Sequence, residues 1–165
     1  MNGDFSLEQW LDVALEATGE VATTALGGEF RVTHLEPPDP SIRTGAYIPL
    51  RSADQSLLVG LLGTESTCRK LARTLLGMED EPEGDPSDPD VADAVGEIVN
   101  MLAGGIQRRM NGNDSRVELG LPIFVRGAIL PTRRMEATMA GVVFDDVEAE
   151  LLMFREPLTA RGDHR

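Results

Sequence analysis

The sequence predicts an α/β protein of the α+β type, in which two pseudo-symmetric halves form one sheet with long helices packed on one face. Three observations lead to this prediction. The chain has 165 residues, 41% of them hydrophobic, which is enough for one compact domain over residues 1–165. Its apolar residues switch between helical and strand-like spacing in a regular order. The helical segments also repeat within the chain.

The repeat relates two helical segments whose equivalent residues lie 77 positions apart. Gly19-Glu20-Val21-Ala22-Thr23 matches Gly96-Glu97-Ile98-Val99-Asn100, and Gly27-Gly28 matches Gly104-Gly105. Three strand-like segments follow each copy, so we expect two helix-plus-three-strand halves, over about residues 6–77 and 87–156. Asn100 corresponds to Thr23, so only the second copy carries both polar groups. A site used once would permit this asymmetry.

The first half begins with a predicted helix over residues 6–26. Ser6 and Gln9 can form a capping box at its start, and Gly27-Gly28 ends it. Trp10, the single tryptophan, is expected to anchor the core. Strands are predicted over residues 30–35, 45–50 and 55–62, the last two as a hairpin. A helix over residues 65–76 follows, with Thr64 as its cap.

An acidic segment over residues 78–90 joins the halves. It holds seven acidic residues and three prolines but no basic residue. Such a composition cannot bury a core, which indicates a solvated linker. The alternative is that its charge steers a basic partner surface towards the protein.

The second half is organised around a long helix over residues 87–110. We expect Asp88 to cap it, with Pro89 at the first helical position. At about 100° per residue, one face is apolar, with Val91, Val95, Ile98, Leu102 and Ile106. The opposite face carries Asp93, Glu97, Asn100, Gly104 and Arg108.

The remaining segments complete the second half. Residues 116–127 contain a strand interrupted or bulged around Pro122. Residues 133–144 and 148–155 alternate as strands do, and residues 157–165 are expected to form a flexible tail.

Composition and missing motifs exclude several function classes. The net charge of −13 argues against nucleic acid and anionic membrane as partners. Cys68 is the single cysteine and is expected to be a buried apolar residue, so no disulfide framework is predicted. No signal peptide is visible, so we expect a cytoplasmic protein. His34 and His164 have no neighbours at metal-ligand spacing, and no metal site, phosphate loop or nucleophile elbow is predicted.

The polar face of the long helix is the candidate site. Glu97 and Asn100 are three residues apart, so both point the same way, and Gly104 leaves the backbone beside them open to close approach. Taken alone, this spacing also fits a solvated helix face. However, Asp93-x-x-x-Glu97-x-x-Asn100-Met101-Leu102-Ala103-Gly104, followed by Gly120-Leu121-Pro122 and Gly127, resembles the CheX branch of the CheC/CheX/FliY family. These proteins are chemotaxis-type phosphatases that act on phosphorylated CheY-like response regulators.

The resemblance implies a fold, a reaction and a set of roles. Asn100 would position the attacking water and Glu97 would dock to the receiver's active-site lysine. Asp93, Met101 and Gly104 would contact the partner. The protein would need no cofactor of its own, because the Mg²⁺ belongs to the receiver. CheX-like members keep one active helix and form dimers through sheet contacts, so a homodimer is implied. Gly105 departs from the family pattern, which has Asn there in many members.

Two rival hypotheses remain open. One is a non-catalytic adaptor that binds a receiver, or a flagellar-switch-like scaffold, which would have no need of a water-positioning amide at Asn100. The other is a protein that binds a different basic partner through its acidic segment. Deleting residues 79–86 would abolish binding in that case and leave a phosphatase nearly intact.

Overall fold

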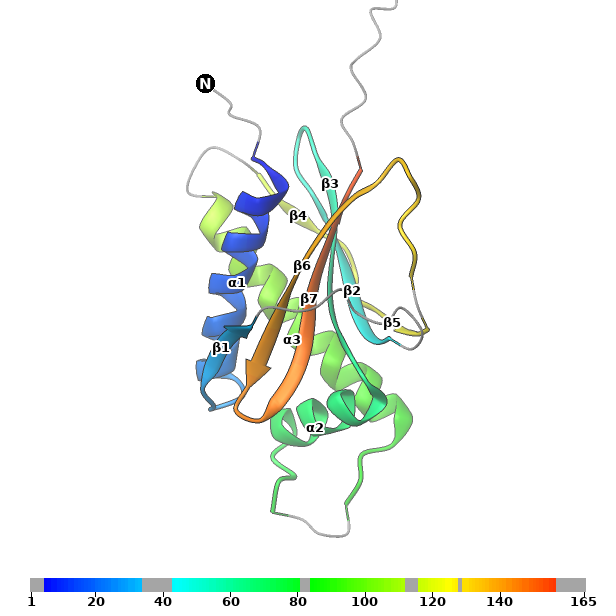
Figure 1. The fold of residues 1–165 in the computed structure, drawn as a ribbon. Coiled ribbons are helices and arrows are strands. Elements are labelled where there is room, and N and C mark those ends of the chain that lie inside the picture. Colours follow the sequence, from blue (N-terminus) through cyan, green and yellow to red (C-terminus); the bar gives the residue numbers. More distant parts are fainter. Residues whose placement is uncertain (1–4, 34–42, 81–83, 112–115, 128, 157–165) are drawn as a thin grey trace, which may run out of the picture.

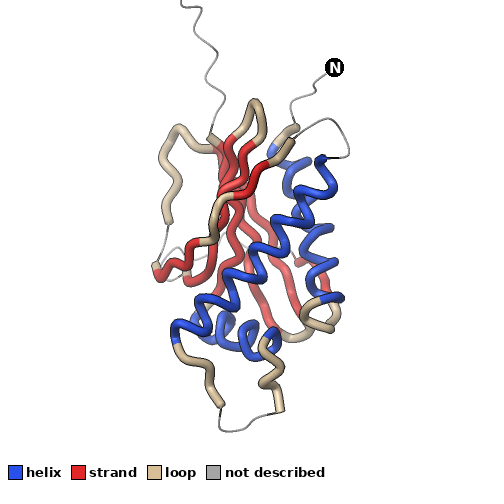
Figure 2. The backbone as a smooth tube through the Cα atoms, turned by 180° about the vertical axis from the view of Figure 1, so that it is seen from behind, coloured by secondary structure: helices blue, strands red, loops and turns tan. Residues whose placement is uncertain are grey.

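The computed structural model describes residues 5–33, 43–80, 84–111, 116–127 and 129–156. Within these residues, three helices cover one face of a seven-stranded sheet (Figures 1 and 2). The helices are α1 (Leu7–Thr24), α2 (Glu65–Leu75) and α3 (Asp88–Asn111). The strands are β1 (Phe30–Thr33), β2 (Thr44–Arg51), β3 (Ser56–Gly63), β4 (Glu118–Leu119), β5 (Ile123–Arg126), β6 (Glu136–Phe144) and β7 (Val147–Arg155).

The order of the strands confirms the predicted pseudo-symmetric sheet. The order is β1-β6-β7-β3-β2-β4, β5 also pairs with β2, and every pairing is antiparallel. β4 and β5 are the two parts of the strand that was expected to be interrupted around Pro122. If they count as one strand, exchanging the two halves gives the same order read from the opposite edge of the sheet, with β3 beside β7 at the centre.

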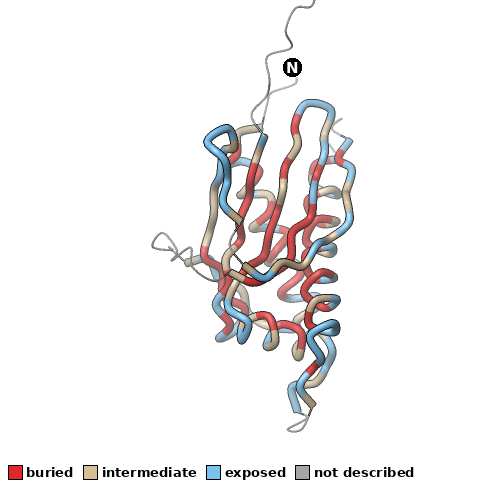
Figure 3. The backbone as a smooth tube through the Cα atoms, turned by 90° about the vertical axis from the view of Figure 1, so that its right-hand side faces the viewer, coloured by how far each residue is buried: buried red, intermediate tan, exposed pale blue. Residues whose placement is uncertain are grey.

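The larger hydrophobic core lies between the helices and the sheet (Figure 3). The observed ends of the helices agree largely with the predicted ones. Ser6 and Gln9 form the expected capping box, and the Thr64 side chain accepts from the backbone of Thr67. Trp10 is 2% exposed, and its indole N–H donates to Gln55 Oε1 at 2.7 Å. The predicted tail and both histidines lie outside the described residues.

The predicted role of Cys68 is confirmed. This cysteine is buried in α2, where its Sγ donates to the carbonyl of Thr44 at 3.4 Å. Burial raises the pKa of the thiol to about 11. The thiol therefore stays protonated at neutral pH, which makes it a poor nucleophile and metal ligand.

The predicted cap of α3 is wrong by one residue. Ser87, not Asp88, caps the helix, because the Ser87 hydroxyl accepts from the backbone N–H of Asp90 at 3.3 Å. Asp88 is the first residue of α3, and its carboxylate pairs instead with Arg69 at 3.0 Å and with Arg126 at 3.3 Å. These pairs connect the start of α3 to α2 and to β5.

The acidic segment is held to α2 at both of its described ends. The guanidinium of Arg73 donates to the carbonyl oxygens of Met78 and Gly84, at 3.0 and 2.8 Å, and pairs with Asp85 at 3.0 Å. Pro86 is buried, whereas Glu79 and Asp80 are exposed. A basic partner would therefore find some of the acidic residues of this segment exposed and two of them, Asp85 and Asp88, already paired with arginines.

Helices α1 and α3 pack closely where Gly105 faces Ala17. A Cβ atom added to Gly105 would lie 2.9 Å from the Cβ of Ala17, nearer than two methyl groups can approach. At Gly104 the nearest such atom is Nη1 of Arg108, at 3.7 Å. Gly105 therefore sets the distance between the helices, and a larger side chain, such as the Asn that the resemblance led us to expect, has no room in this arrangement.

We expect Gly105→Ala to lower the free energy of unfolding by about 1–3 kcal/mol, because overpacking at the helix crossing outweighs the better helix propensity of alanine. Urea unfolding followed by circular dichroism measures the change. Gly104→Ala is the matched control on the open face, and it should raise stability by up to about 1 kcal/mol. Equal effects of the two substitutions would contradict the close packing at Gly105.

Candidate functional site on helix α3

The polar stripe of α3 is present as predicted. Val91, Val95, Ile98, Leu102 and Ile106 are at most 4% exposed and face the core. Asp93, Glu97, Asn100 and Arg108 are exposed on the opposite face. We call these four residues, together with Gly104, the α3 stripe. The helix is held by the sheet below and by α1 beside it (Figure 2), so the stripe is presented on a rigid support.

Glu97 and Asn100 are free to act on a partner. Within the residues that the structure describes, neither side chain makes a hydrogen bond or an ion pair, and the same is true of Asp93. A carboxylate and an amide one helical turn apart supply acceptor oxygens and an N–H₂ donor on one face. This pair can orient a water molecule or a cationic side chain that approaches from solvent.

The other residues of the predicted site lie around this pair. Met101 is half-buried and packs against the core, so only part of its side chain can reach a partner. Gly96, in the turn before Asn100, faces Pro122, whose side-chain carbons lie 3.8 Å from the position of an added Cβ. The corner between β4 and β5 therefore flanks the stripe on one side, and α1 flanks it on the other.

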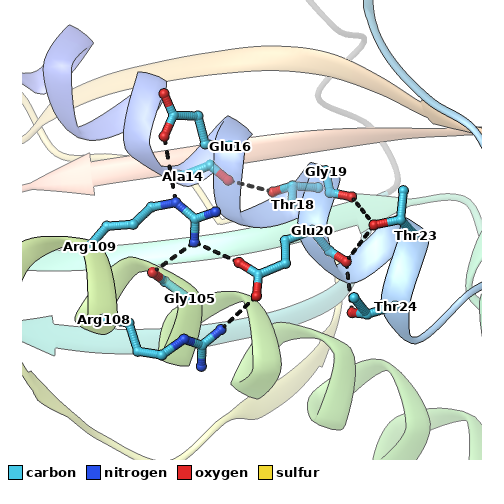
Figure 4. Close-up of polar contacts among 10 residues, drawn as sticks. All are labelled: Ala14, Glu16, Thr18, Gly19, Glu20, Thr23, Thr24, Gly105, Arg108 and Arg109. Atoms are coloured by element: carbon cyan, nitrogen blue, oxygen red, sulfur yellow. Dashed lines mark hydrogen bonds and ion pairs between the residues drawn. The ribbon is translucent and has the colours of Figure 1, made fainter.

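The equivalent residues on α1 already have ion-pair or hydrogen-bond partners within the protein (Figure 4). Glu20, the counterpart of Glu97, pairs with Arg109 at 2.8 Å and with Arg108 at 3.1 Å. The hydroxyl of Thr23, the counterpart of Asn100, donates to the backbone carbonyl of Glu20 at 3.1 Å and lies 3.3 Å from that of Gly19. The first copy of the repeat is thus a contact between helices, whereas the second copy faces solvent.

The arginines also set the electrostatics of this contact. The hydrogen bond from Arg109 lowers the pKa of Glu20 from its ordinary value, and the charge of Arg108 acts in the same direction. A lowered pKa means that the contact stabilises the fold above the ordinary pKa of glutamate. This contribution is lost as the pH falls through the lowered pKa.

Sequence reasoning placed Arg108 on the stripe but missed its partner on α1. The repeat drew attention to Glu20 only as a counterpart of Glu97. The signal that could have found the contact is the pair of adjacent arginines at the end of α3, which can pair with acidic residues of a neighbouring helix. Within the described residues, no group of three or more His, Cys, Asp or Glu side chains is arranged to hold a metal ion.

If the α3 stripe is the phosphatase site that the resemblance implies, Thr23→Asn should not create a second one on α1, because Glu20 remains bound by two arginines. The test is to add this substitution to a chain that already carries Asn100→Ala and to follow decay of a phosphorylated receiver. The double variant should be as inactive as Asn100→Ala alone. Recovery of activity would show that the α1 face is limited by the missing amide and not by the arginines.

Fold and site together define a helix-on-sheet protein with one exposed acidic and amide pair on its central helix. The family model for chemotaxis phosphatase CheX matches residues 45–144. The chain therefore belongs to the CheX family. A comparison with curated proteins found no match. No helix among the described residues is long and apolar enough to cross a membrane.

Solved structures share the fold at low sequence identity. CheX from Desulfovibrio desulfuricans is 15% identical with a TM-score of 0.70, over 92% of this chain and 99% of that one. A CheX-CheY-BeF3-Mg²⁺ complex from Borrelia burgdorferi is similar at 16% identity and a TM-score of 0.67, over 90% and 98% of the two chains. FliY from Thermotoga maritima follows at 13% identity and a TM-score of 0.61, over 95% and 92%.

Proposed function

We propose that this protein hydrolyses the aspartyl phosphate of a CheY-like response-regulator receiver. One observation carries the proposal: Glu97 and Asn100 are exposed and without partners in the described structure, while their counterparts on α1 are engaged. Membership of the CheX family supports it, as does the fold shared with a CheX that forms a complex with CheY, BeF3 and Mg²⁺. The substrate would be a folded receiver domain that docks on the α3 stripe.

The chemistry requires little beyond positioning. An aspartyl phosphate is an activated acyl phosphate, because its leaving group is a carboxylate of low pKa. Water attacks phosphorus in line with the leaving oxygen, the bond between phosphorus and that oxygen breaks, and the products are inorganic phosphate and the free aspartate. A neutral amide that donates and accepts hydrogen bonds can hold this water without acting as a strong base. Asn100 has this role in the proposal.

Glu97 has a different role, that of docking. An exposed carboxylate one turn before Asn100 can pair with the active-site lysine of the receiver, which fixes the helix over the phosphoryl group. Asp93 adds negative charge to the same end of the stripe. The receiver's own carboxylates hold the Mg²⁺, so the protein supplies no cofactor.

A homodimer belongs to the same proposal. The edges of the described sheet are β1 on one side and β4 with β5 on the other. Both edges carry exposed apolar side chains, since Val32 is 52% exposed and Ile123 is 60% exposed. Sheet contacts through an edge would cover such residues. Sedimentation equilibrium at several protein concentrations tests this part, and a monomer at all of them would contradict it.

The alternative function is a receiver-binding adaptor or a flagellar-switch-like scaffold without turnover, and the shared fold of FliY supports it. The two functions differ in what happens to the bound phosphate. The test is decay of phosphorylated receivers from the same organism, with and without the protein. Faster decay of one receiver supports the phosphatase. A receiver that is bound but decays at its own rate would favour the adaptor.

A further inference from the structure

The α3 stripe continues past Asn100 to a cation that the proposed reaction does not use. Arg108 is 65% exposed in its side chain and donates to Oε1 of Glu20 at 3.1 Å. Its Nη1 lies 3.7 Å from the position that a Cβ on Gly104 would occupy. The guanidinium therefore folds back along the helix over Gly104, in the direction of Asn100. Side chains on a helix lean towards its N-terminus, and the contact with Glu20 holds the guanidinium in that direction.

Glu20 holds the Arg108 side chain in place (Figure 4). Its second oxygen, Oε2, accepts from Arg109 at 2.8 Å, and Arg109 also donates to the backbone carbonyl of Gly105 at 3.1 Å. Arg109 is only 29% exposed and ties α1 to α3 by itself. The contact of Arg108 with Oε1 is more exposed and contributes little to stability. This contact holds the guanidinium of Arg108 at one place on the stripe, and its remaining N–H groups can bind a partner.

We propose that Arg108 is a docking residue that binds a surface carboxylate of the receiver beside its phosphorylation site, and that Glu20 positions it. The inference rests on the proposed function, because it takes the receiver as the partner of the stripe. The protein carries a net charge of −13, and Asp93 and Glu97 add negative charge to the stripe itself. The proposed receiver holds its Mg²⁺ through carboxylates, and a guanidinium pairs well with a carboxylate. A cation held on an otherwise acidic stripe therefore favours docking of such a surface.

The position of Arg108 favours a surface carboxylate over the phosphoryl group. Arg108 follows Asn100 by two turns, which is about 12 Å along the axis at 1.5 Å per residue. Because the side chain folds back over Gly104, its guanidinium lies about one turn nearer to Asn100 than this. It still does not reach a water molecule in contact with Asn100. Arg108 therefore acts on the strength of docking and not on the chemical step.

The experiment compares binding of a CheY-like receiver loaded with Mg²⁺ and beryllofluoride to the wild type, Arg108→Ala and Arg108→Lys. The matched control is Arg133→Ala, which changes the net charge equally at an exposed position of the loop before β6. Arg108→Ala should weaken binding about tenfold at low salt, and this loss should shrink as salt screens the charges, while Arg133→Ala changes the affinity less than about twofold. Arg108→Lys should recover part of the loss. Turnover at saturating receiver should stay within about twofold of wild type.

Glu20→Gln tests the positioning role. It should weaken binding about threefold, and it should have no further effect once Arg108 is alanine, as residues that act through one another do. Equal binding by Arg108→Ala and Arg133→Ala would overturn the inference and leave the proposed function intact. A fall in turnover at saturation would also overturn it, because Arg108 would then act in the chemical step. If the wild type binds no receiver, the proposed function fails and this inference fails with it.

Discussion

Replacing Asn100 by alanine is expected to lower phosphatase turnover at least about 100-fold while leaving receiver binding within about threefold of wild type. The amide is exposed and without a partner in the described structure, so its removal disturbs no packing. What is lost is the group that holds water in line with phosphorus, and a misplaced nucleophile costs on the order of 100-fold in rate. Decay of radiolabelled phosphoreceiver, measured at saturating receiver, gives the turnover.

Two further variants sharpen this expectation. Asn100→Asp keeps the size of the side chain but adds a negative charge close to the phosphoryl group, so it should be no more active than Asn100→Ala. Thr23→Ala alters the equivalent residue on α1, whose hydroxyl is bonded to its own helix, and should keep full activity. Activity of Asn100→Ala near that of the wild type would remove Asn100 from the mechanism.

Replacing Glu97 by alanine is expected to weaken receiver binding by about 30-fold or more. Truncating one partner of a buried charge pair at an interface costs about 2–5 kcal/mol, much of it from the partner charge left unpaired. The loss should appear mainly in KM, because Glu97 makes a docking contact present before the transition state. Isothermal titration with a beryllofluoride-loaded receiver measures the affinity directly.

The control for Glu97 is another exposed acid of the same stripe. Asp93→Ala removes the same charge one turn earlier on α3 and should weaken binding less than about threefold, because an exposed charge at the end of the stripe contributes little to binding. A receiver whose active-site lysine is replaced by alanine should bind wild type and Glu97→Ala equally. Different affinities for that receiver would show that Glu97 docks to another group.

Local pattern was sufficient to predict much of α3. Its core face follows from a spacing that only a helix satisfies, and Val91, Val95, Ile98, Leu102 and Ile106 are all buried as expected. The start of the helix was less well determined. Ser87 and Asp88 are both good capping residues, and the choice depends on Arg69 and Arg126, which reach Asp88 from distant parts of the chain. The sequence alone does not show which of Ser87 and Asp88 takes the capping position.

The asymmetry between the two copies was only half predictable. Thr23 in place of Asn100 is visible in the sequence, and it pointed to one site. The engagement of Glu20 by Arg108 and Arg109 is not visible, because it depends on how closely α1 and α3 cross. That distance is set by Gly105 against Ala17, a contact between residues far apart in the chain. Tertiary packing, and not the motif alone, decides which copy stays free.

The most direct test of the account follows one receiver through binding and decay side by side, with wild type and Asn100→Ala. The account predicts that both bind the phosphorylated receiver with similar affinity and that only the wild type speeds its decay. If both proteins bind and neither alters the decay, the protein is an adaptor, and Glu97 and Asn100 are docking contacts.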